Sequence, residues 1–280
     1  MIRSKLLFTA CIATLAACGA GVRADEAADD AAKKLGLKLV EHLPEIKVDV
    51  TLSTHFEMRF NGDPVGYTMA TLRGVQTDKG PRYEYSDVSL IRGPNGQTRE
   101  LHTAGVLDRH FRPETVTWVA ISRSPNGTTT EVKETLRVEE KEVSLNRGDS
   151  NEMSTSTLPK PKERFVHIAG YLFSLLPVRD GQTFRLQEFD TEKKEFVWRT
   201  YRARKNRGSE MRLSVMDEKG ADEAAYYAIA ANGDILEHGI SAAPFIFVHC
   251  TAERIDEIKK EWAKAKVNTK SPTKPADPKK

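Results

Sequence analysis

Polar and apolar side chains alternate along residues 50–60, which places the apolar ones on one face of an extended segment. This pattern predicts a half-buried β-strand. Residues 61–64, Asn-Gly-Asp-Pro, suit a turn, and the alternation resumes at Val65, Tyr67 and Met69. The stretch 50–71 therefore predicts a β-hairpin. The apolar positions of its first strand are Val50, Leu52, Phe56, Met58 and Phe60.

The same strand and turn pattern recurs through most of the chain. Turns rich in Gly, Asn, Asp and Pro separate alternating or β-branched segments about every 8 to 12 residues, which is typical of an antiparallel meander. We therefore expect a mostly β (α+β) fold. The further predicted strands are 82–90, 98–103, 115–122, 128–138, 141–145, 153–158, 183–189, 196–204, 211–216, 224–230 and 235–240.

One segment in the middle of the chain breaks this pattern. Residues 163–176 carry large apolar side chains around most of a helical circumference, and Pro159, Pro161 and Pro177 flank them. The pattern predicts a buried helix, which is too short to span a bilayer. If this helix covers the sheet as a lid, the covering side chains are Phe165, Ile168, Leu172 and Phe173.

Two further helices are predicted at the ends of the β-rich body. Residues 25–47 contain leucines at helical spacing and predict a helical spacer or N-terminal arm. Residues 251–265 predict an amphipathic helix with Ile255, Ile258 and Trp262 on one stripe and Thr251 as its N-cap. No Gly/Ser-rich or Pro-rich linker divides residues 48–263, so we expect them to form a single domain.

The first 24 residues have the order of a secretory signal peptide. Arg3 and Lys5 precede an apolar run over 6–17, which is too short for a membrane span, and small residues follow. Two cleavage sites compete. Residues 15–18, Leu-Ala-Ala-Cys, resemble the bacterial lipobox, which implies lipidation of Cys18, whereas cleavage after Ala24 would release a soluble chain. Both predict an extracytoplasmic bacterial protein, either periplasmic or anchored to a membrane.

The charge of the chain depends on which segment is considered. Removing residues 1–24 takes away three of the 43 basic residues and leaves 40, which equals the 40 acidic ones. The tail, residues 264–280, is rich in Lys and Pro and poor in apolar residues, so we expect it to be disordered and to favour an anionic membrane or wall polymer. The remaining body is mildly acidic, which argues against a nucleic-acid binder.

Residues that could carry chemistry are scattered. The sequence contains no Gly-x-Ser-x-Gly elbow, no phosphate-binding Gly-rich loop and no His-Glu-x-x-His motif, and its 7 histidines lack metal-ligand spacing. Cys250 is the one cysteine outside the signal region and is expected to be a small buried residue without a disulfide partner. We therefore predict no catalytic residue, no metal site and no cofactor.

Four short motifs resemble a family of bacterial extracytoplasmic proteins of uncharacterised function, whose fold is similar to the periplasmic lipoprotein carriers LolA and LolB. They are residues 60–67 (FNGDPVGY), 107–113 (LDRHFRP), 156–159 (STLP) and 175–182 (LLPVRDGQ). The resemblance covers about residues 48–242. It implies a strongly curved antiparallel sheet or half-open barrel, with helices on a concave face that can hold an acyl chain. It carries over no catalytic residues.

The favoured hypothesis is a non-enzymatic envelope protein that binds a lipid, a lipoprotein acyl chain or a partner protein on the curved sheet. Two alternatives remain: a structural cell-surface lipoprotein whose helix fills the concavity, and a hydrolase of envelope polymers built from scattered His, Asp and Glu. The oligomeric state is open. The candidate binding face consists of Phe56, Met58, Phe60, Tyr67, Met69, Phe184, Leu186, Phe196 and Trp198.

Overall fold

Fifteen strands hydrogen-bond into one sheet in the computed structural model, which describes residues 26–268 apart from positions 94, 150–151, 168–169, 207–209, 218–219 and 242. The side chains of 26, 170 and 264–268 are also outside this description. The strand order is β8-β7-β6-β5-β4-β3-β2-β1-β15-β14-β13-β12-β11-β10-β9. The predicted signal peptide with Cys18, and most of the predicted tail, lie outside the described residues.

Each half of the sheet is a meander. The first half contains β1 (Thr51–Phe60), β2 (Asp63–Thr77), β3 (Gly80–Arg92), β4 (Thr98–Leu107), β5 (Pro113–Arg123), β6 (Thr129–Val138), β7 (Val143–Asp149) and β8 (Met153–Leu158). The second contains β9 (Phe165–Val166), β10 (Thr183–Asp190), β11 (Glu195–Lys205), β12 (Met211–Met216), β13 (Glu223–Ile229), β14 (Ile235–Ile240) and β15 (Phe245–Cys250). Neighbouring strands are antiparallel except for β9 and β10. The prediction of a mostly β fold is confirmed.

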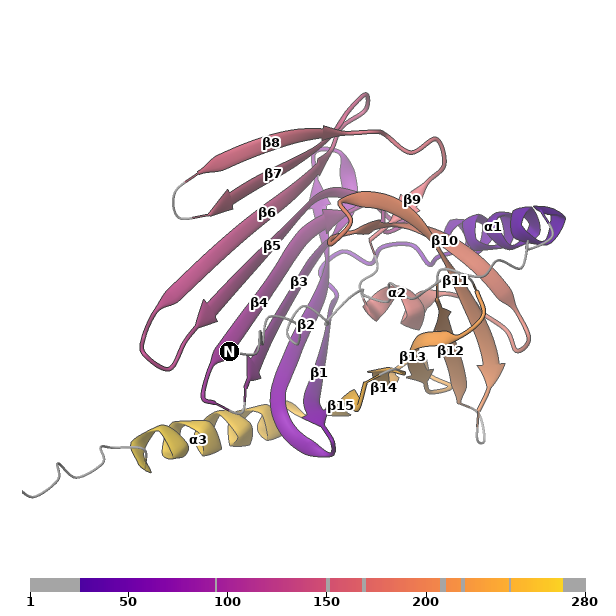
Figure 1. The fold of residues 1–280 in the computed structure, drawn as a ribbon. Coiled ribbons are helices and arrows are strands. Elements are labelled where there is room, and N and C mark those ends of the chain that lie inside the picture. Colours follow the sequence, from indigo (N-terminus) through magenta and orange to yellow (C-terminus); the bar gives the residue numbers. More distant parts are fainter. Residues whose placement is uncertain are drawn as a thin grey trace, which may run out of the picture.

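Strand β15 joins the two halves by pairing with β1, from His55 opposite Cys250 to Phe60 opposite Phe245. This strand is absent from the predicted set, although its apolar residues suit a strand between two others. The joined sheet curves so that both halves face the short helix α2 (Gly170–Leu175) (Figure 1). The two edge strands, β8 and β9, do not pair with each other, so the sheet does not close into a barrel. We call the side that faces α2 concave and the opposite side convex.

The first hairpin differs from prediction because of one extra residue. Phe60 pairs with Asp63 and Arg59 with Pro64, but Met58 pairs with Gly66, so Val65 is a bulge. Side chains alternate with a period of two, and a one-residue shift therefore moves every later side chain to the opposite face. Glu57, on the convex side, is consequently paired with Tyr67. The prediction that Tyr67 and Met69 share a face with Phe56 and Met58 is wrong.

The central helix is shorter than predicted. Residues 165–166 form strand β9, and only 170–175 are helical, so the range 163–176 is wrong at its N-terminal side. Strand β9 pairs with β10, with Phe165 opposite Gln187 and Val166 opposite Glu188. These interstrand hydrogen bonds satisfy backbone groups that would bond within the helix if the helix began earlier. Ile168 lies outside the described residues.

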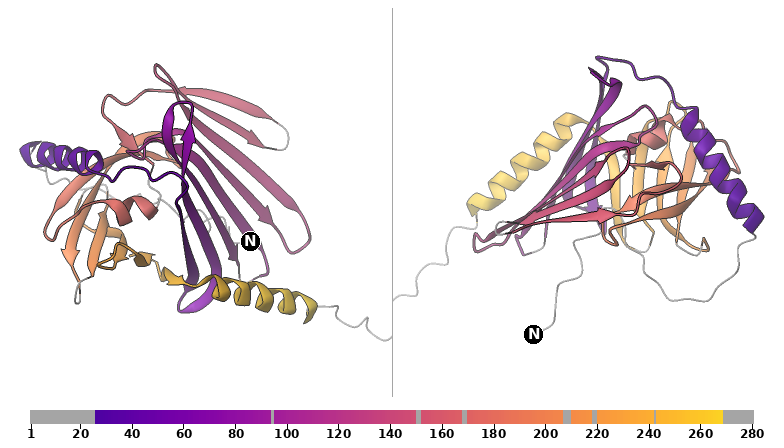
Figure 2. Two further views of the ribbon diagram at one scale, coloured as in Figure 1. Left: turned by 180° about the vertical axis from the view of Figure 1, so that it is seen from behind. Right: turned by 90° about the horizontal axis from the view of Figure 1, so that it is seen from above.

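The two terminal helices pack against different parts of the sheet (Figure 2). Helix α3 (Ala252–Asn268) lies on the convex side of β1 and β2, and the Arg254 backbone N–H donates to the Thr251 hydroxyl, which confirms the predicted N-cap. Helix α1 (Glu26–Glu41) packs against β10, where Asp29 pairs with Arg185. A Cβ at Gly36 would lie 1.9 Å from the Arg185 carbonyl oxygen, so this close approach requires glycine. The predicted arm is therefore helical but packed.

None of the helices in the described ranges is long and apolar enough to cross a membrane.

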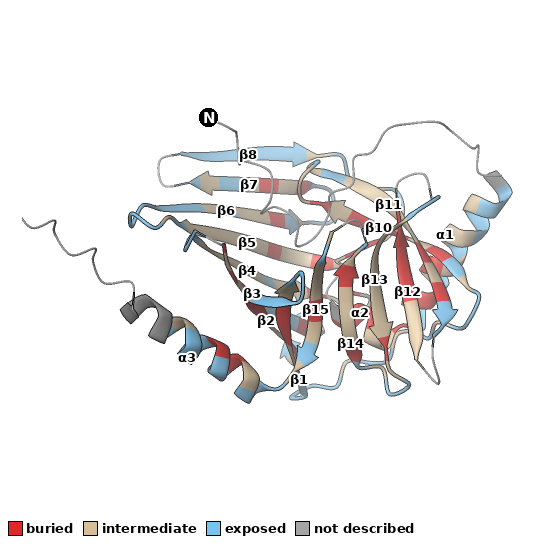
Figure 3. Ribbon diagram, turned by 60° about the horizontal axis from the view of Figure 1, so that its bottom comes forward, coloured by how far each residue is buried: buried red, intermediate tan, exposed pale blue. Residues whose placement is uncertain are grey.

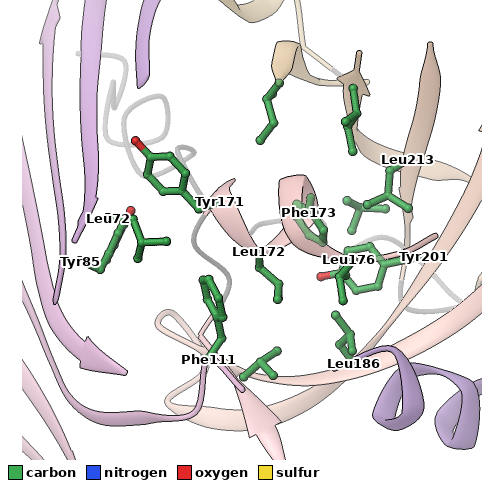
Figure 4. Packing of buried hydrophobic residues seen from close by; sticks show 14 of the residues in the cluster. Leu72, Tyr85, Phe111, Tyr171, Leu172, Phe173, Leu176, Leu186, Tyr201 and Leu213 are labelled. Atoms are coloured by element: carbon green, nitrogen blue, oxygen red, sulfur yellow. The ribbon is translucent and has the colours of Figure 1, made fainter. Parts of the chain in front are cut away.

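The main core lies between α2 and the second half of the sheet. Leu172, Phe173 and Leu176 are buried, and in Figure 4 Phe173 and Leu176 point toward Tyr201, whereas Tyr171 points toward Tyr85 on the other half. Buried positions run along the strands that face α2, and the outer ends of β6, β7 and β8 are more exposed (Figure 3). The two halves of the sheet are thus held together through α2 and the joint between β1 and β15.

Candidate functional site

The concave side contains a cavity of about 450 Å³. Its floor is formed by two neighbouring rows of residues that cross the first half of the sheet in register. The first row is Thr54, Ala70, Asp87, Thr103, Trp118, Glu134 and Arg147, running from β1 to β7. The second row is Phe56, Thr68, Ser89, Leu101, Ala120 and Val132, running from β1 to β6.

The walls of the cavity come from three other parts of the chain. The segment between β9 and α2 contributes His167, and α2 contributes Tyr171. The end of the β10–β11 hairpin forms a second wall, which includes Glu188, Phe189 and Lys194. Strands β13 to β15 form the third with Tyr227, Ile235, His238 and Phe247. Residues far apart in the sequence therefore enclose one space.

The next row along the strands consists mostly of large, buried side chains. Its members are Leu72, Tyr85, Gly105, Val116, Leu136 and Leu145, and all of these except Gly105 are buried. On β2 the floor rows contain the smaller Ala70 and Thr68 beside Leu72, and on β3 the smaller Asp87 and Ser89 follow Tyr85. The smaller side chains leave room for the hollow on these two strands.

Asp87 lies in the middle of the floor. Its carboxylate accepts a hydrogen bond from the Ser89 hydroxyl (3.2 Å), and Ser89 also shares a hydrogen bond with Thr68 (2.8 Å). Burial raises the pKa of Asp87 to about 7, against the opposing effects of the Ser89 hydrogen bond and the charge of His102. In the described part of the chain, Asp87 forms no salt bridge.

Aromatic rings lie around this carboxylate. Tyr85 precedes Asp87 by two residues on the same face, and its ring centroid is 5.5 Å from that of His167. The His167 ring also lies 6.2 Å from Trp118. The Tyr171 hydroxyl donates to the carbonyl of Ala70 (2.6 Å), which pairs with Asp87 across β2 and β3. Burial, with a contribution from the Asp87 charge, raises the pKa of Tyr171 to about 12.

His167 is an uncharged wall group. Burial lowers its pKa to about 4, and its Nε2 atom has no hydrogen-bond partner among the described residues. A buried polar atom without a partner is costly unless water or a ligand satisfies it. His167 therefore offers one unused polar contact at the edge of the cavity.

Two other cavity carboxylates, Glu134 and Glu188, have cationic partners. Glu134 lies 2.5 Å from the Lys194 ammonium and 3.5 Å from Arg147. Glu188 lies 2.7 Å from Arg199 and accepts a hydrogen bond from the Tyr201 hydroxyl (3.1 Å). Burial nevertheless raises the pKa of Glu188 to about 7. Their charges are locally balanced, unlike that of Asp87.

A stack of rings closes the cavity near the β1–β15 joint. The His238 ring lies 4.0 Å from Phe247 and 5.4 Å from Tyr227, in nearly parallel planes, and contacts the edge of Phe56 at 5.1 Å. Burial lowers the pKa of His238 to about 3, so this ring is neutral near pH 7. The stack provides a flat apolar wall.

The histidines and carboxylates of the described residues bear on the metal-site and hydrolase alternatives. No group of three or more His, Cys, Asp or Glu in this part of the chain is arranged to hold a metal ion. His102 is hydrogen-bonded to a carboxylate, that of Glu100 (3.4 Å). His167 and His238 line the cavity but face aromatic rings. The hydrolase alternative gains no catalytic arrangement from these contacts and stays a prediction.

The predicted binding face is divided between several environments. Phe56 lines the cavity, Met58 is fully buried beside it, and Phe60 is 38% exposed at the end of the hairpin. Tyr67 and Met69 lie on the convex side beneath Ile255, Ile258 and Trp262 of α3.

The second predicted hairpin is divided in the same way. Phe184 and Leu186 are buried in the core with Tyr201, whereas Phe196 and Trp198 lie on the opposite face of β10 and β11. Phe196 packs on Phe165 and Phe189, and Trp198 lies under Lys33 of α1. The prediction of one shared apolar face is wrong here as well, because adjacent strand positions were combined without their register.

The predicted lid residues belong to the core. Phe165, Leu172 and Phe173 are buried, but none of them lines the cavity. The sequence interpretation missed Asp87, Trp118 and His167. Asp87 and Ser89 follow Tyr85 on the inward face of an alternating strand, and a carboxylate at such a position is the signal that could have indicated a cavity.

Neither protein-family models nor curated proteins match this sequence. Among solved structures, the chain is similar to the crystal structure of a β-barrel-like protein of a domain of unknown function, DUF1849, from Brucella abortus. The two share 10% sequence identity with a TM-score of 0.47, and the similarity covers 73% of this chain and 96% of that chain.

Proposed function

We propose that the protein is a non-enzymatic binding protein of the bacterial envelope that holds one amphiphilic small molecule, such as a lipid, in the concave cavity. The observation that supports this proposal best is the cavity itself. Its volume of about 450 Å³ lies within the range of about 300–1,000 Å³ that is typical of small-molecule sites.

The composition of the cavity favours a ligand with an apolar part and a polar part. Phe56, Trp118, Phe189 and Phe247 supply large apolar surfaces, and Asp87 supplies a charged group on the floor. Protein interiors are normally packed with few voids larger than a water molecule. A large hollow bordered by a closely packed row of side chains is therefore better explained as a binding site than as a packing fault.

The proposed location rests on the ends of the chain. The order of charged, apolar and small residues in 1–24 supports export, with Cys18 or the residue after Ala24 as the mature N-terminus. The Lys-rich residues 264–280 would hold the protein near anionic membrane or wall polymer. Such a location would give the cavity access to envelope lipids.

The proposal is tested by filling the cavity. Ala120 lies on the floor in β5, so Ala120→Trp places an indole into the hollow. The control is Lys133→Trp in β6, where the residue is exposed and pairs with Val119. Each protein is purified with its native ends, and extracted lipids are identified by mass spectrometry. Binding of a fluorescent apolar probe is measured in parallel.

We expect wild type and Lys133→Trp to carry lipid and to bind the probe, and Ala120→Trp to lose both at least about 10-fold. If wild type neither carries lipid nor binds the probe, the binding function is refuted and the structural-lipoprotein alternative is favoured. Equal binding by all three proteins would place the ligand outside the cavity and would also refute the proposal.

A further inference from the structure

We propose that the cavity selects a ligand with a positively charged head group, a protonated amine or a quaternary ammonium, which binds at Asp87 among Tyr85, Trp118 and Tyr171. This inference rests on the proposed function, because it names the chemical class of the same ligand.

The charge of Asp87 favours a cationic ligand. Its carboxylate lies in the central floor row, between Ala70 and Thr103, and the described residues give it the Ser89 hydroxyl but no salt bridge. Taking a carboxylate out of water without a cation costs several kcal/mol in general. A cationic ligand would offset this cost, and a neutral or anionic head group would not.

Most cationic side chains near the cavity contact other carboxylates, and Arg99, which also lines the cavity, lies four residues along β4 from Thr103, the residue that pairs with Asp87. Lys194 and Arg147 contact Glu134, and Arg199 contacts Glu188 and Asp190. His102 is bonded to Glu100, although its charge affects Asp87. His167 is neutral because burial lowers its pKa to about 4. Of the cavity carboxylates Asp87, Glu134 and Glu188, Asp87 is thus the one whose counter-charge a ligand can contribute.

Aromatic side chains line the same cavity as Asp87. Trp118 lies in the same row as Asp87, two strands away, and Tyr85 lies on the same strand and face. The Tyr171 hydroxyl donates to the carbonyl of Ala70, which pairs with Asp87, so Tyr85, Asp87 and Tyr171 line the same part of the cavity. Aromatic faces attract cations within about 6 Å of the ring centre, and cages of such rings recognise quaternary ammonium groups.

The inference is tested with ligands that differ in the head group alone. Dodecyltrimethylammonium, 1-dodecanol and dodecyl sulfate are titrated into the full-length protein by calorimetry at pH 8, below the concentrations at which they aggregate. We expect the ammonium compound to bind at least about 10-fold more tightly than the alcohol, and the sulfate to bind most weakly.

Two variants test whether Asp87 causes the preference for the ammonium compound. Asp87→Asn should lower the affinity for the ammonium compound to about that for the alcohol. The matched control is Glu84→Gln, which removes an exposed carboxylate from the convex face of the same strand. It should keep the wild-type preference.

The outcomes separate the two proposals. Equal binding of ammonium and alcohol by wild type, or preference for the sulfate, overturns the cationic head group and leaves the binding function standing. If none of the three compounds binds wild type, the proposed function itself fails. Since the comparison of head groups uses wild type, it remains decisive even if Asp87→Asn does not fold.

Discussion

The Arg254 side chain of α3 donates a hydrogen bond of 2.7 Å to the buried carboxylate of Glu57 in β1, on the convex side of the sheet. Arg59 donates to the same carboxylate at 2.8 Å. Burial alone would raise the pKa of Glu57, but the two arginines keep it below its usual value. This cluster fixes α3 over Tyr67, where Ile258 is fully buried.

Arg254→Ala should therefore destabilise the protein. The substitution leaves Glu57 buried with Arg59 as its remaining cation, so we expect the free energy of unfolding to fall by about 2–3 kcal/mol. Urea denaturation followed by circular dichroism measures this change. The double variant Glu57→Gln/Arg254→Ala should recover part of the loss, since it removes the buried negative charge and leaves the more exposed Arg59 to water. A loss below about 0.5 kcal/mol in Arg254→Ala would mean that the pair does not hold α3.

Asp87→Asn should stabilise the protein at high pH. The carboxyl has a reference pKa of 3.8 and a pKa of about 7 in the fold, so the unfolded chain loses its proton first. Its contribution to stability falls as the pH rises from about 4 to 7 and is constant above that. Asparagine does not titrate, so the free energy of unfolding of the variant lacks this decrease. We expect its free energy of unfolding to equal that of wild type near pH 4 and to exceed it by about 1–3 kcal/mol at pH 8.

Urea denaturation at pH 4, 6 and 8 measures this difference, with Glu84→Gln as the control. Glu84 is exposed on the opposite face, so its substitution removes a carboxylate without changing the cavity floor. A difference between Asp87→Asn and wild type that is the same at all three pH values would show that burial does not disfavour the charge of Asp87.

His238→Phe should protect the protein against acid. The ring stacks on Phe247 and Tyr227, and burial lowers its pKa from 6.5 to about 3. The unfolded chain gains a proton below about pH 6.5 while the fold does not, so wild type loses stability as the pH falls toward 3. Phenylalanine retains the stacking without titrating. We expect the variant to gain about 1–2 kcal/mol over wild type between pH 7 and pH 5.

Thermal unfolding at the two pH values tests this prediction. His42→Phe on the exposed end of α1 is a suitable control, since that ring lies on the surface. If the stability of His238→Phe relative to wild type is the same at pH 7 and pH 5, the ring is accessible to protons in the fold.

Gly66→Ala should be strongly destabilising. A Cβ at this position would lie 2.4 Å from the Leu90 carbonyl oxygen and 3.1 Å from the Met58 sulfur. The carbonyl belongs to a central strand and cannot move without disturbing the ladder, so we expect a cost of about 2 kcal/mol or more. Gly148→Ala is the matched control, because its nearest neighbour would be the Met153 side chain at 3.5 Å. Equal stabilities of the two variants would contradict the packing at the hairpin bulge.

Local patterns were sufficient to predict most strands and the C-terminal helix. Alternation of apolar and polar side chains is a property of neighbouring residues, and so is the N-cap at Thr251. Strand β9 was missed because it contains two residues, and its pairing with β10 depends on a partner distant in the sequence. The same tertiary pairing shortened the predicted central helix.

The face of the sheet on which each side chain lies was harder to predict than the position of the strands in the sequence. The single extra residue Val65 moved Tyr67 and Met69 under α3, and the periodicity of each strand taken alone gave no sign of this shift. A bulge is stabilised by how two strands pair, so its position depends on the sheet as a whole.

The sequence by itself determined that this chain forms many half-buried antiparallel strands and one amphipathic C-terminal helix, because those properties follow from the period of neighbouring side chains. The tertiary structure alone decided that β15 pairs with β1, and that Asp87 and Trp118 lie in one row across the sheet with Tyr171 above it. Register between strands and the packing of α2 join residues from distant segments, and these set the cavity and the charge within it.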